Sequence, residues 1–254
     1  MTHRARLIVF AVGAAGFTLL MLWGVFGLPR YGHYQGPYGD VINAAVTGER
    51  HIAEAVGAVT FDYRGIDTMG EEVILFAAVA GVAIVLREQQ GDDEEEDLDE
   101  SAGRTGSDTS ETVRFIGQLM LPLTVLVGLY VVGHGHVSPG GGFQGGVVIA
   151  GGLLMLYVAG DYRAMQRQLP LNAVEGAEAT GVAGYVAIAI IGLVVGTALL
   201  DNVFPLGTSG QLLSGGMVPL LNLTVGLEVG AGIVLVAIEF LDDMVRVPQR
   251  PVIR

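Results

Sequence analysis

The sequence contains no cysteine and no lysine. The absence of cysteine excludes disulfides, thiolate catalysis and cysteine-ligated metal sites. The 13 positively charged side chains are all arginine and the formal net charge is −13, so the basic surface that nucleic-acid binding requires is missing. An acidic surface without lysine suits a high-salt environment, in which screening weakens the repulsion between like charges.

Charged residues of both signs are scarce as well. They make up 15% of the chain, against roughly 25% in an average soluble domain. Hydrophobic residues make up 51%, and the mean hydropathy is +0.55. A chain of 254 residues cannot bury that much apolar surface in a water-soluble core. The composition therefore predicts an integral membrane protein.

Long apolar runs predict an all-α fold of about six transmembrane helices. About 20 residues are needed to cross a hydrocarbon core of about 30 Å. The six expected spans are residues 7–28, 67–86, 115–132, 143–159, 180–200 and 220–241. A cleaved signal peptide is the alternative for the first run. A short interfacial helix is the alternative for the second, because only its part after residue 72 is free of acids.

An acidic stretch separates the second run from the third. Residues 88–110 are rich in Gly, Ser, Asp and Glu, which predicts a disordered linker. The expected organisation is a two-helix module at 1–87, the linker, and a four-helix module at 111–254. Residues 40–59 form a weakly amphipathic helix candidate before the second span. Most arginines fall on one side of such a topology, so we expect a multi-pass protein of the plasma membrane with both termini in the cytoplasm.

A glycine-rich tract lies between the third and fourth runs, with the sequence GHGHVSPGGGFQGG at residues 133–146. Glycine permits close backbone approach, and irregular backbone beside a bilayer must be buried in protein or line a watery cavity. The tract therefore predicts a re-entrant or tightly packed turn. His134 and His136 are a weak metal signal without a nearby carboxylate, so proton handling or polar packing is favoured and no resident metal is expected.

This tract resembles the signature of the B-subunit family of Mrp-type multisubunit sodium/proton antiporters. The matching residues are His134, Gly135 and His136, followed by Ser138, Pro139, Gly140, Gly141, Gly142, Phe143, Gln144, Gly145 and Gly146. The similarity extends over roughly residues 111–240, which is the length of that family. It implies a four-helix subunit that works inside a larger complex.

A second resemblance covers the front of the chain. Residues 61–71, FDYRGIDTMGE, resemble a DFRGxDTxGE segment. That segment occurs at the C-terminal end of the largest protein of these antiporters. It also occurs in a small E-type protein of membrane-bound hydrogenase complexes. The whole chain then resembles an E-type module fused to a B-type module.

Acidic residues in or near the apolar runs are the main candidates for an ion path, since intramembrane carboxylates are costly and usually face a bundle interior. Glu228 is the deepest; it is either a proton or cation site or the partner of a basic residue from another subunit. Glu71 and Asp67 lie one helical turn apart and could share a proton or a cation. The alternative is that Asp67 caps the helix and Glu71 lies among the headgroups. Glu72 is expected to be more exposed than Glu71.

Just before and at the start of the second expected span, Arg64, Asp62 and Asp67 are expected to form a local ion network. The resemblance implies a non-enzymatic subunit of a complex that exchanges Na⁺ or K⁺ for H⁺, contributing to the ion path or to assembly. Its partners would be the other subunits and the bilayer, without a cofactor.

Three alternatives stay open. The chain could serve a membrane-bound hydrogenase or a related energy-converting oxidoreductase complex. It could be a membrane enzyme with His134 and His136 as metal ligands, or a stand-alone channel or structural membrane protein.

Overall fold

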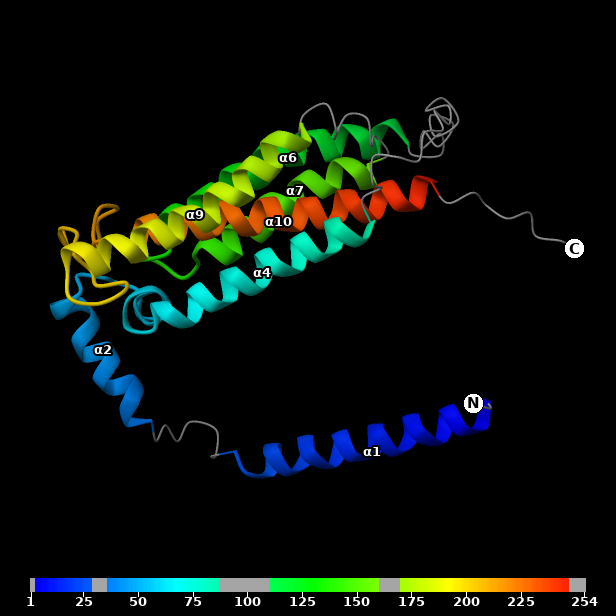
Figure 1. Cartoon of the computed structure of the whole chain (residues 1–254), viewed down its shortest axis with the longest axis horizontal. Coiled ribbons are helices and arrows are strands. Elements are labelled where there is room, and N and C mark those ends of the chain that lie inside the picture. Colours follow the sequence, from blue (N-terminus) through cyan, green and yellow to red (C-terminus); the bar gives the residue numbers. More distant parts are fainter. Residues whose placement is uncertain (1–2, 29–35, 87–109, 160–169, 247–254) are drawn as a thin grey trace, which may run out of the picture. The chain divides into compact units, whose positions relative to one another are not determined.

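The computed structural model describes residues 3–28, 36–86, 110–159 and 170–246, and every regular element in these ranges is helical. The long helices are α1 (His3–Phe26), α4 (Gly65–Leu86), α6 (Glu111–His134), α7 (Gly142–Val158), α9 (Leu171–Val195) and α10 (Val218–Arg246). Shorter ones are α2 (Pro37–Glu49), α3 (Ala55–Ala58) and the π-helical turn η1 (Val59–Tyr63). Figure 1 shows their course.

Five of these helices are long and apolar enough to cross a membrane: α1, α4, α6, α9 and α10. The sixth expected span, α7, is also apolar but has only 17 residues. The all-α membrane fold is thus confirmed. The acidic linker predicted at residues 88–110 lies almost wholly outside the described residues.

Two helix boundaries differ from the prediction. Residues 40–59 do not form one helix, because α2 ends at Glu49 and His51 takes a positive φ of 54° that no helix accommodates. Glu54 then caps α3 by accepting a hydrogen bond of 2.6 Å from the Gly57 N–H. In addition, α9 begins at Leu171 rather than near residue 180, and it therefore contains Glu178.

The chain divides into two compact units, Met1–Val41 and Ile42–Arg254. In the first unit, α1 carries large apolar side chains that are exposed on all sides, as suits a helix surrounded by lipid. In the second unit, α10 packs against α4, α7 and α9, while α6 packs mainly against α7. Helix α4 therefore belongs to the same body as the last four helices, although the sequence suggests a boundary between them.

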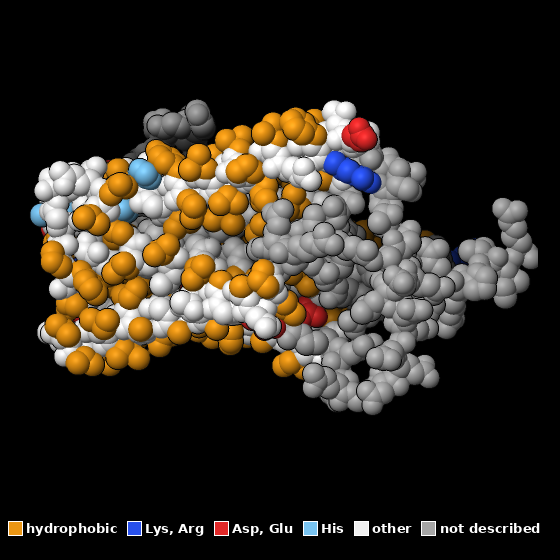
Figure 2. Space-filling model, turned by 90° about the horizontal axis from the view of Figure 1, so that it is seen from above, with side chains coloured by type: hydrophobic (Ala, Val, Ile, Leu, Met, Phe, Trp, Pro, Cys, Tyr) orange, Lys and Arg blue, Asp and Glu red, His pale blue; other side chains and the backbone are white. Residues whose placement is uncertain are grey.

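Two apolar clusters form the core of this second unit. One lies towards the loops and contains Ile52, Phe61, Tyr185, Met217 and Leu221. The other lies further along the helices and includes Val79, Ala150 and Leu235. Apolar side chains also run along the outer face in Figure 2, as expected of helices in a bilayer.

Candidate functional site

Four glutamates are buried inside membrane-spanning helices of the described chain, and one of them, Glu239, lies near the C-terminal end of the span in α10. The other three are Glu72 on α4, Glu178 on α9 and Glu228 on α10, with exposed fractions of 1%, 7% and 0%. We call them the carboxyl cluster. Because α10 packs against both α4 and α9, the three side chains come from neighbouring helices of one bundle. Their burial matters because an isolated charged carboxylate in an apolar interior is very costly.

Glycines let the helices approach closely around the cluster. A Cβ added to Gly181 of α9 would lie 2.7 Å from the backbone nitrogen of Glu228. The backbones of α9 and α10 therefore touch where the Glu228 side chain leaves its helix. One turn further along α10, a Cβ on Gly232 would lie 3.8 Å from Oε1 of Glu178. Sequence and packing thus bring Glu178 and Glu228 to the same contact between helices.

Glu72 and Glu228 lie on two helices that pack against each other, close enough for their carboxyl groups to interact electrostatically. A hydrogen bond between two carboxyl groups requires a proton on one of them. In the described part of the chain, none of their four oxygens accepts a hydrogen bond from any other group, and Oε1 of Glu178 also lacks a donor. The charge of Glu228 acts on Glu178, so each member of the cluster has another acid as a neighbour.

Polar groups continue from Glu72 towards the loops. Thr68, one turn earlier on α4, is buried and donates a hydrogen bond of 2.8 Å from Oγ1 to the Thr60 carbonyl. The buried Tyr185 of α9 donates from its hydroxyl to the Gly65 carbonyl at 2.9 Å. The Tyr185 hydrogen bond joins the start of α4 to α9, and the Thr68 hydrogen bond joins α4 to the preceding turn η1.

The structure reverses the expected exposure of the two adjacent glutamates. Glu72 is buried and Glu71 is exposed, because the inward face of α4 carries Thr68, Glu72 and Val79 at helical spacing. Asp67 is also exposed and forms an ion pair with Arg64. Glu228 is buried, as its position in the run suggests. The roles of Glu71, Asp67 and Glu228 in an ion path stay predictions.

Sequence reasoning missed Glu178 because it lies before the uninterrupted apolar run. A signal was nevertheless present: Gly181 and Gly184 share a helix face with Glu178 at spacings of three and six residues. Small residues on such a stripe indicate a close helix contact, and an acid on the same stripe must then be buried in that contact.

The glycine-rich tract forms a tightly packed turn between α6 and α7, as predicted. Gly140 and Gly141 have φ values of 144° and 147°, which other residues rarely adopt. The N–H of Gly142 donates to Oδ1 of the buried Asn222 at 2.8 Å, and Nδ2 of Asn222 donates to the Val218 carbonyl at 3.1 Å. Asn222, which sequence analysis did not single out, thus anchors the start of α7 to α10.

The two histidines of this tract have different surroundings. His134 stacks on Tyr130 with ring centroids 4.0 Å apart, and its Nδ1 lies 2.9 Å from the Tyr130 carbonyl. His136 is fully buried, and its Nε2 lies 3.3 Å from the Gln211 carbonyl. Burial lowers the pKa of His136, which favours the neutral ring. Within the described ranges, no group of three or more metal-ligating side chains occurs.

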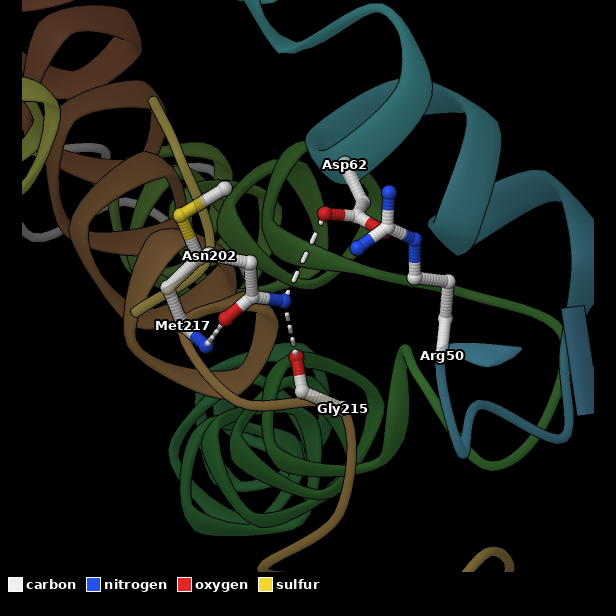
Figure 3. Close-up of polar contacts among 5 residues, drawn as sticks. All are labelled: Arg50, Asp62, Asn202, Gly215 and Met217. Carbon is white, nitrogen blue, oxygen red and sulfur yellow. Dashed lines mark hydrogen bonds and ion pairs between the residues drawn. The ribbon is translucent and has the colours of Figure 1, made fainter. Parts of the chain in front are cut away.

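The loops at one end of the bundle are joined by an ion pair and an amide. Arg50 Nε lies 2.9 Å from the buried Asp62 carboxylate. As Figure 3 shows, Asn202 lies between Asp62 and the chain before α10: its Nδ2 donates to Asp62 and Gly215, and its Oδ1 accepts from the Met217 N–H. Burial raises the pKa of Asp62, and the Arg50 guanidinium opposes that shift. The expected three-residue network is therefore two separate pairs, Asp62 with Arg50 and Asp67 with Arg64.

Comparisons with known proteins agree with this architecture. Residues 112–235 match a domain related to the MnhB subunit of a Na⁺/H⁺ antiporter. The uncharacterized protein MJ1307 of Methanocaldococcus jannaschii is 31% identical over 204 residues, which cover 72% of this chain and 74% of that protein. A probable K⁺/H⁺ antiporter protein of Rhizobium meliloti, described as an A/B subunit, is 25% identical over 190 residues, which cover 67% of this chain but only 18% of that much longer protein.

Two solved structures are similar over nearly the whole chain. A chain of the membrane-bound sulfane sulfur reductase, an archaeal respiratory membrane complex, matches with a TM-score of 0.71 and 28% identity, covering 94% of this chain and 99% of that one. A chain of the Mrp complex from Dietzia sp. DQ12-45-1b matches with a TM-score of 0.73 and 23% identity, covering 99% of this chain and 27% of that one. At that identity, the second match shows a shared fold alone.

Proposed function

We propose that the chain is a membrane subunit of a multisubunit cation/proton antiporter complex of the Mrp type, because residues 112–235 match a domain related to the MnhB subunit of a Na⁺/H⁺ antiporter. The complex exchanges Na⁺ or K⁺ for H⁺, and the transmembrane proton potential supplies the free energy. The chain itself carries out no covalent chemistry. Its partners are the other subunits of the complex and the surrounding lipid.

The observation that carries this proposal is the carboxyl cluster. Within the described ranges, the three acids of the carboxyl cluster are buried in membrane-spanning helices, and the oxygens of Glu72 and Glu228 have no hydrogen-bond donor, which is costly to stability. A purely structural subunit has no need of them. Groups that take up and release positive charge explain both their burial and their lack of donors. The cluster therefore favours a part in the ion path over assembly alone.

The architecture of the subunit follows from the same premise. A fusion of an E-type front module with a B-type four-helix module is supported by the match to the sulfane sulfur reductase chain, which extends far beyond the MnhB-related residues. The arginine distribution supports cytoplasmic positions for both termini. In this arrangement the carboxyl cluster lies between helices of both modules, since Glu72 precedes the linker and Glu228 follows it.

The test is cation-dependent proton exchange in inverted membrane vesicles that contain the whole complex, with and without this chain. We expect Na⁺ or K⁺ to collapse an imposed pH gradient only when the chain is present. Native gels of the same membranes should show that the remaining subunits still assemble. Full exchange by an assembled complex that lacks the chain would contradict the proposal.

A second candidate is an ion-translocating subunit of an energy-converting oxidoreductase complex. The match to a sulfane sulfur reductase chain, which is covered over 99% of its length, favours it. In such a complex, redox subunits would drive the ion movement. Purification of the native complex distinguishes the two candidates, because only the second predicts stoichiometric iron and a proton current that depends on an electron donor.

A further inference from the structure

The carboxyl cluster contains one pair with unusual surroundings. Glu72 and Glu228 are at least 99% buried, and in the described residues none of their four carboxyl oxygens has a hydrogen-bond partner. The other titratable groups that act on the pair are Glu71 on α4 and Glu178 and Tyr185 on α9. None of these is a base, so no side chain among the described residues is found to supply a positive charge to the pair.

Two adjacent carboxylates in an apolar interior cannot both stay charged without compensation. A single proton between them removes one negative charge and creates a strong hydrogen bond between a carboxyl O–H and a carboxylate. A second proton removes the remaining charge. The pair can therefore exist with one or two protons, and a change between these states moves one proton to or from the interior of the bundle.

The packing argues against a metal cation at this position. A hard cation needs a cage of several oxygen ligands. Here the α9 and α10 backbones touch at Gly181, and a side chain even as small as alanine would meet the Glu228 backbone. A hollow between α4 and α9 in the described part of the chain is lined by apolar residues such as Phe76, Val182 and Val186. The pair thus has space for a proton but lacks a cation cage.

Glu178 provides a connection to one side. Glu178 lies in the first half of α9, which begins at Leu171, and it is one turn before Gly181. It interacts with Glu228 through charge. On the opposite side, an apolar cluster that contains Ile52, Phe61, Met217 and Leu221 lies towards the loops. The hydroxyls of Thr68 and Tyr185 on that side already donate to backbone carbonyls, so Glu178 is the neighbouring carboxyl that can carry a proton to and from the pair.

We propose that Glu72 and Glu228 together hold an exchangeable proton inside the bundle, and that Glu178 passes this proton between the pair and the end of the bundle where α9 begins. This proposal rests on the proposed function, because it assigns the proton-binding step to this subunit. It can nevertheless be tested without any exchange activity.

The first experiment uses dicyclohexylcarbodiimide, an apolar reagent that modifies protonated carboxyl groups, on the assembled complex in membranes near neutral pH. Peptide mass spectrometry should find the label on Glu72 or Glu228 and should not find it on the exposed Glu111, which is the control. Labelling in NaCl, KCl and choline chloride at equal ionic strength should be the same. Protection by Na⁺ or K⁺ would overturn the proposal in favour of a cation site.

The second experiment is infrared spectroscopy of the same complex in H₂O and D₂O. A protonated carboxyl C=O band should be present in the wild type and in Glu111→Gln, and its frequency should change in Glu72→Gln and in Glu228→Gln, because the remaining carboxyl keeps a proton but loses its carboxyl neighbour. In Glu178→Gln the band should remain, but its H/D exchange should be slower by on the order of tenfold or more, because a positioned proton carrier is missing. An H/D exchange rate in Glu178→Gln equal to that of the wild type would overturn the proposed role of Glu178 as proton carrier.

These outcomes separate the two proposals. If the wild-type complex shows neither the label nor the band, the shared proton is absent whatever the complex transports. If both are present while cation-dependent exchange is absent from the vesicles, the proton site exists and the antiporter function fails.

Discussion

Acidic residues have opposite surroundings in two regions of this molecule. At the loop end, which comprises residues 50–67, 135–141 and 196–217, each of four acids has a donor. Asp62 pairs with Arg50, Asp67 pairs with Arg64, Glu54 caps α3, and Asp201 accepts from the N–H and the hydroxyl of Thr197. In the carboxyl cluster, neither Glu72 nor Glu228 has a donor outside the pair in the described residues.

Burial alone does not explain this difference, since Asp62 is nearly as buried as Glu72. The supply of donors explains it. An acid that is satisfied by an arginine or an N–H keeps its charge and fixes the backbone around it. An acid without a donor must take up a positive charge from elsewhere. The loop end is therefore a structural joint, and the carboxyl cluster is a place where charge can be exchanged.

The largest effect should come from the two adjacent glutamates of α4. In the assembled complex, Glu72→Gln should lower cation-dependent proton exchange by on the order of tenfold or more, because it removes a proton-binding group. Glu71→Gln should lower this exchange less, since the Glu71 side chain is exposed and the buried Glu72 next to it is still present. Vesicle assays at equal complex abundance measure both. A larger loss in Glu71→Gln would assign the ion path to the outer face of α4.

The next effect concerns the tight turn at the loop end. Gly135→Ala places a Cβ 2.6 Å from the Gly141 Cα and 2.7 Å from Asn222 Oδ1, so backbone must move at a cost of about 1–3 kcal/mol. Gly133→Ala is the matched control, because nothing lies within 4 Å of its Cβ and it can stabilise α6 by up to about 1 kcal/mol. In detergent, the unfolding temperature of Gly135→Ala should be lower than that of the wild type, and that of Gly133→Ala should be equal or higher.

A smaller effect distinguishes the two ion pairs. Asp62→Ala leaves the Arg50 guanidinium and the Asn202 amide without their acceptor, which should cost about 1–3 kcal/mol. Asp67→Ala removes a solvent-exposed partner of Arg64 and should cost less than about 1 kcal/mol. The measurement is again the unfolding temperature in detergent. Equal decreases in unfolding temperature for the two variants would show that the buried Asp62–Arg50 pair stabilises the fold no more than the exposed Asp67–Arg64 pair.

The smallest effect is a pH dependence at His136. Burial lowers the pKa of His136 in the folded state below its ordinary value of 6.5, so the unfolded chain binds a proton first as the pH falls. The stability that comes from the neutral ring is present above that value and is lost below it, down to the folded-state pKa. Unfolding temperatures between neutral pH and about pH 5 should therefore fall less steeply in His136→Gln than in the wild type.

His134→Gln is the control for that measurement, because His134 is partly exposed and stacks on Tyr130 rather than being enclosed. Its unfolding temperatures should follow the wild-type slope. A His136→Gln variant with the wild-type slope would show that other groups cause the pH dependence.

Much of the architecture could be predicted from sequence because it depends on local composition. The apolar runs located five membrane-crossing helices and the shorter α7, and the glycines of residues 133–146 indicated a packed turn. Helix phase was harder to predict. With Glu71 and Glu72 adjacent, a rotation of about 100° decides which one faces inward, and the sequence of α4 is apolar on nearly all sides. The position of Glu178 was missed for a related reason, since the acids near the start of α9 interrupt its apolar run.

Local sequence is sufficient to place this chain in a membrane as helices, because its apolar length and scarcity of charge leave no water-soluble alternative. It is also sufficient for the tight α6–α7 turn, because only glycine readily tolerates the φ values of Gly140 and Gly141. Which acids come together depends instead on how the helices pack. Glu72, Glu178 and Glu228 are far apart in sequence, and they meet because α4 and α9 both pack on α10, where glycines allow close contact. Packing between helices depends on the shapes of both surfaces, and no single run of residues contains that information.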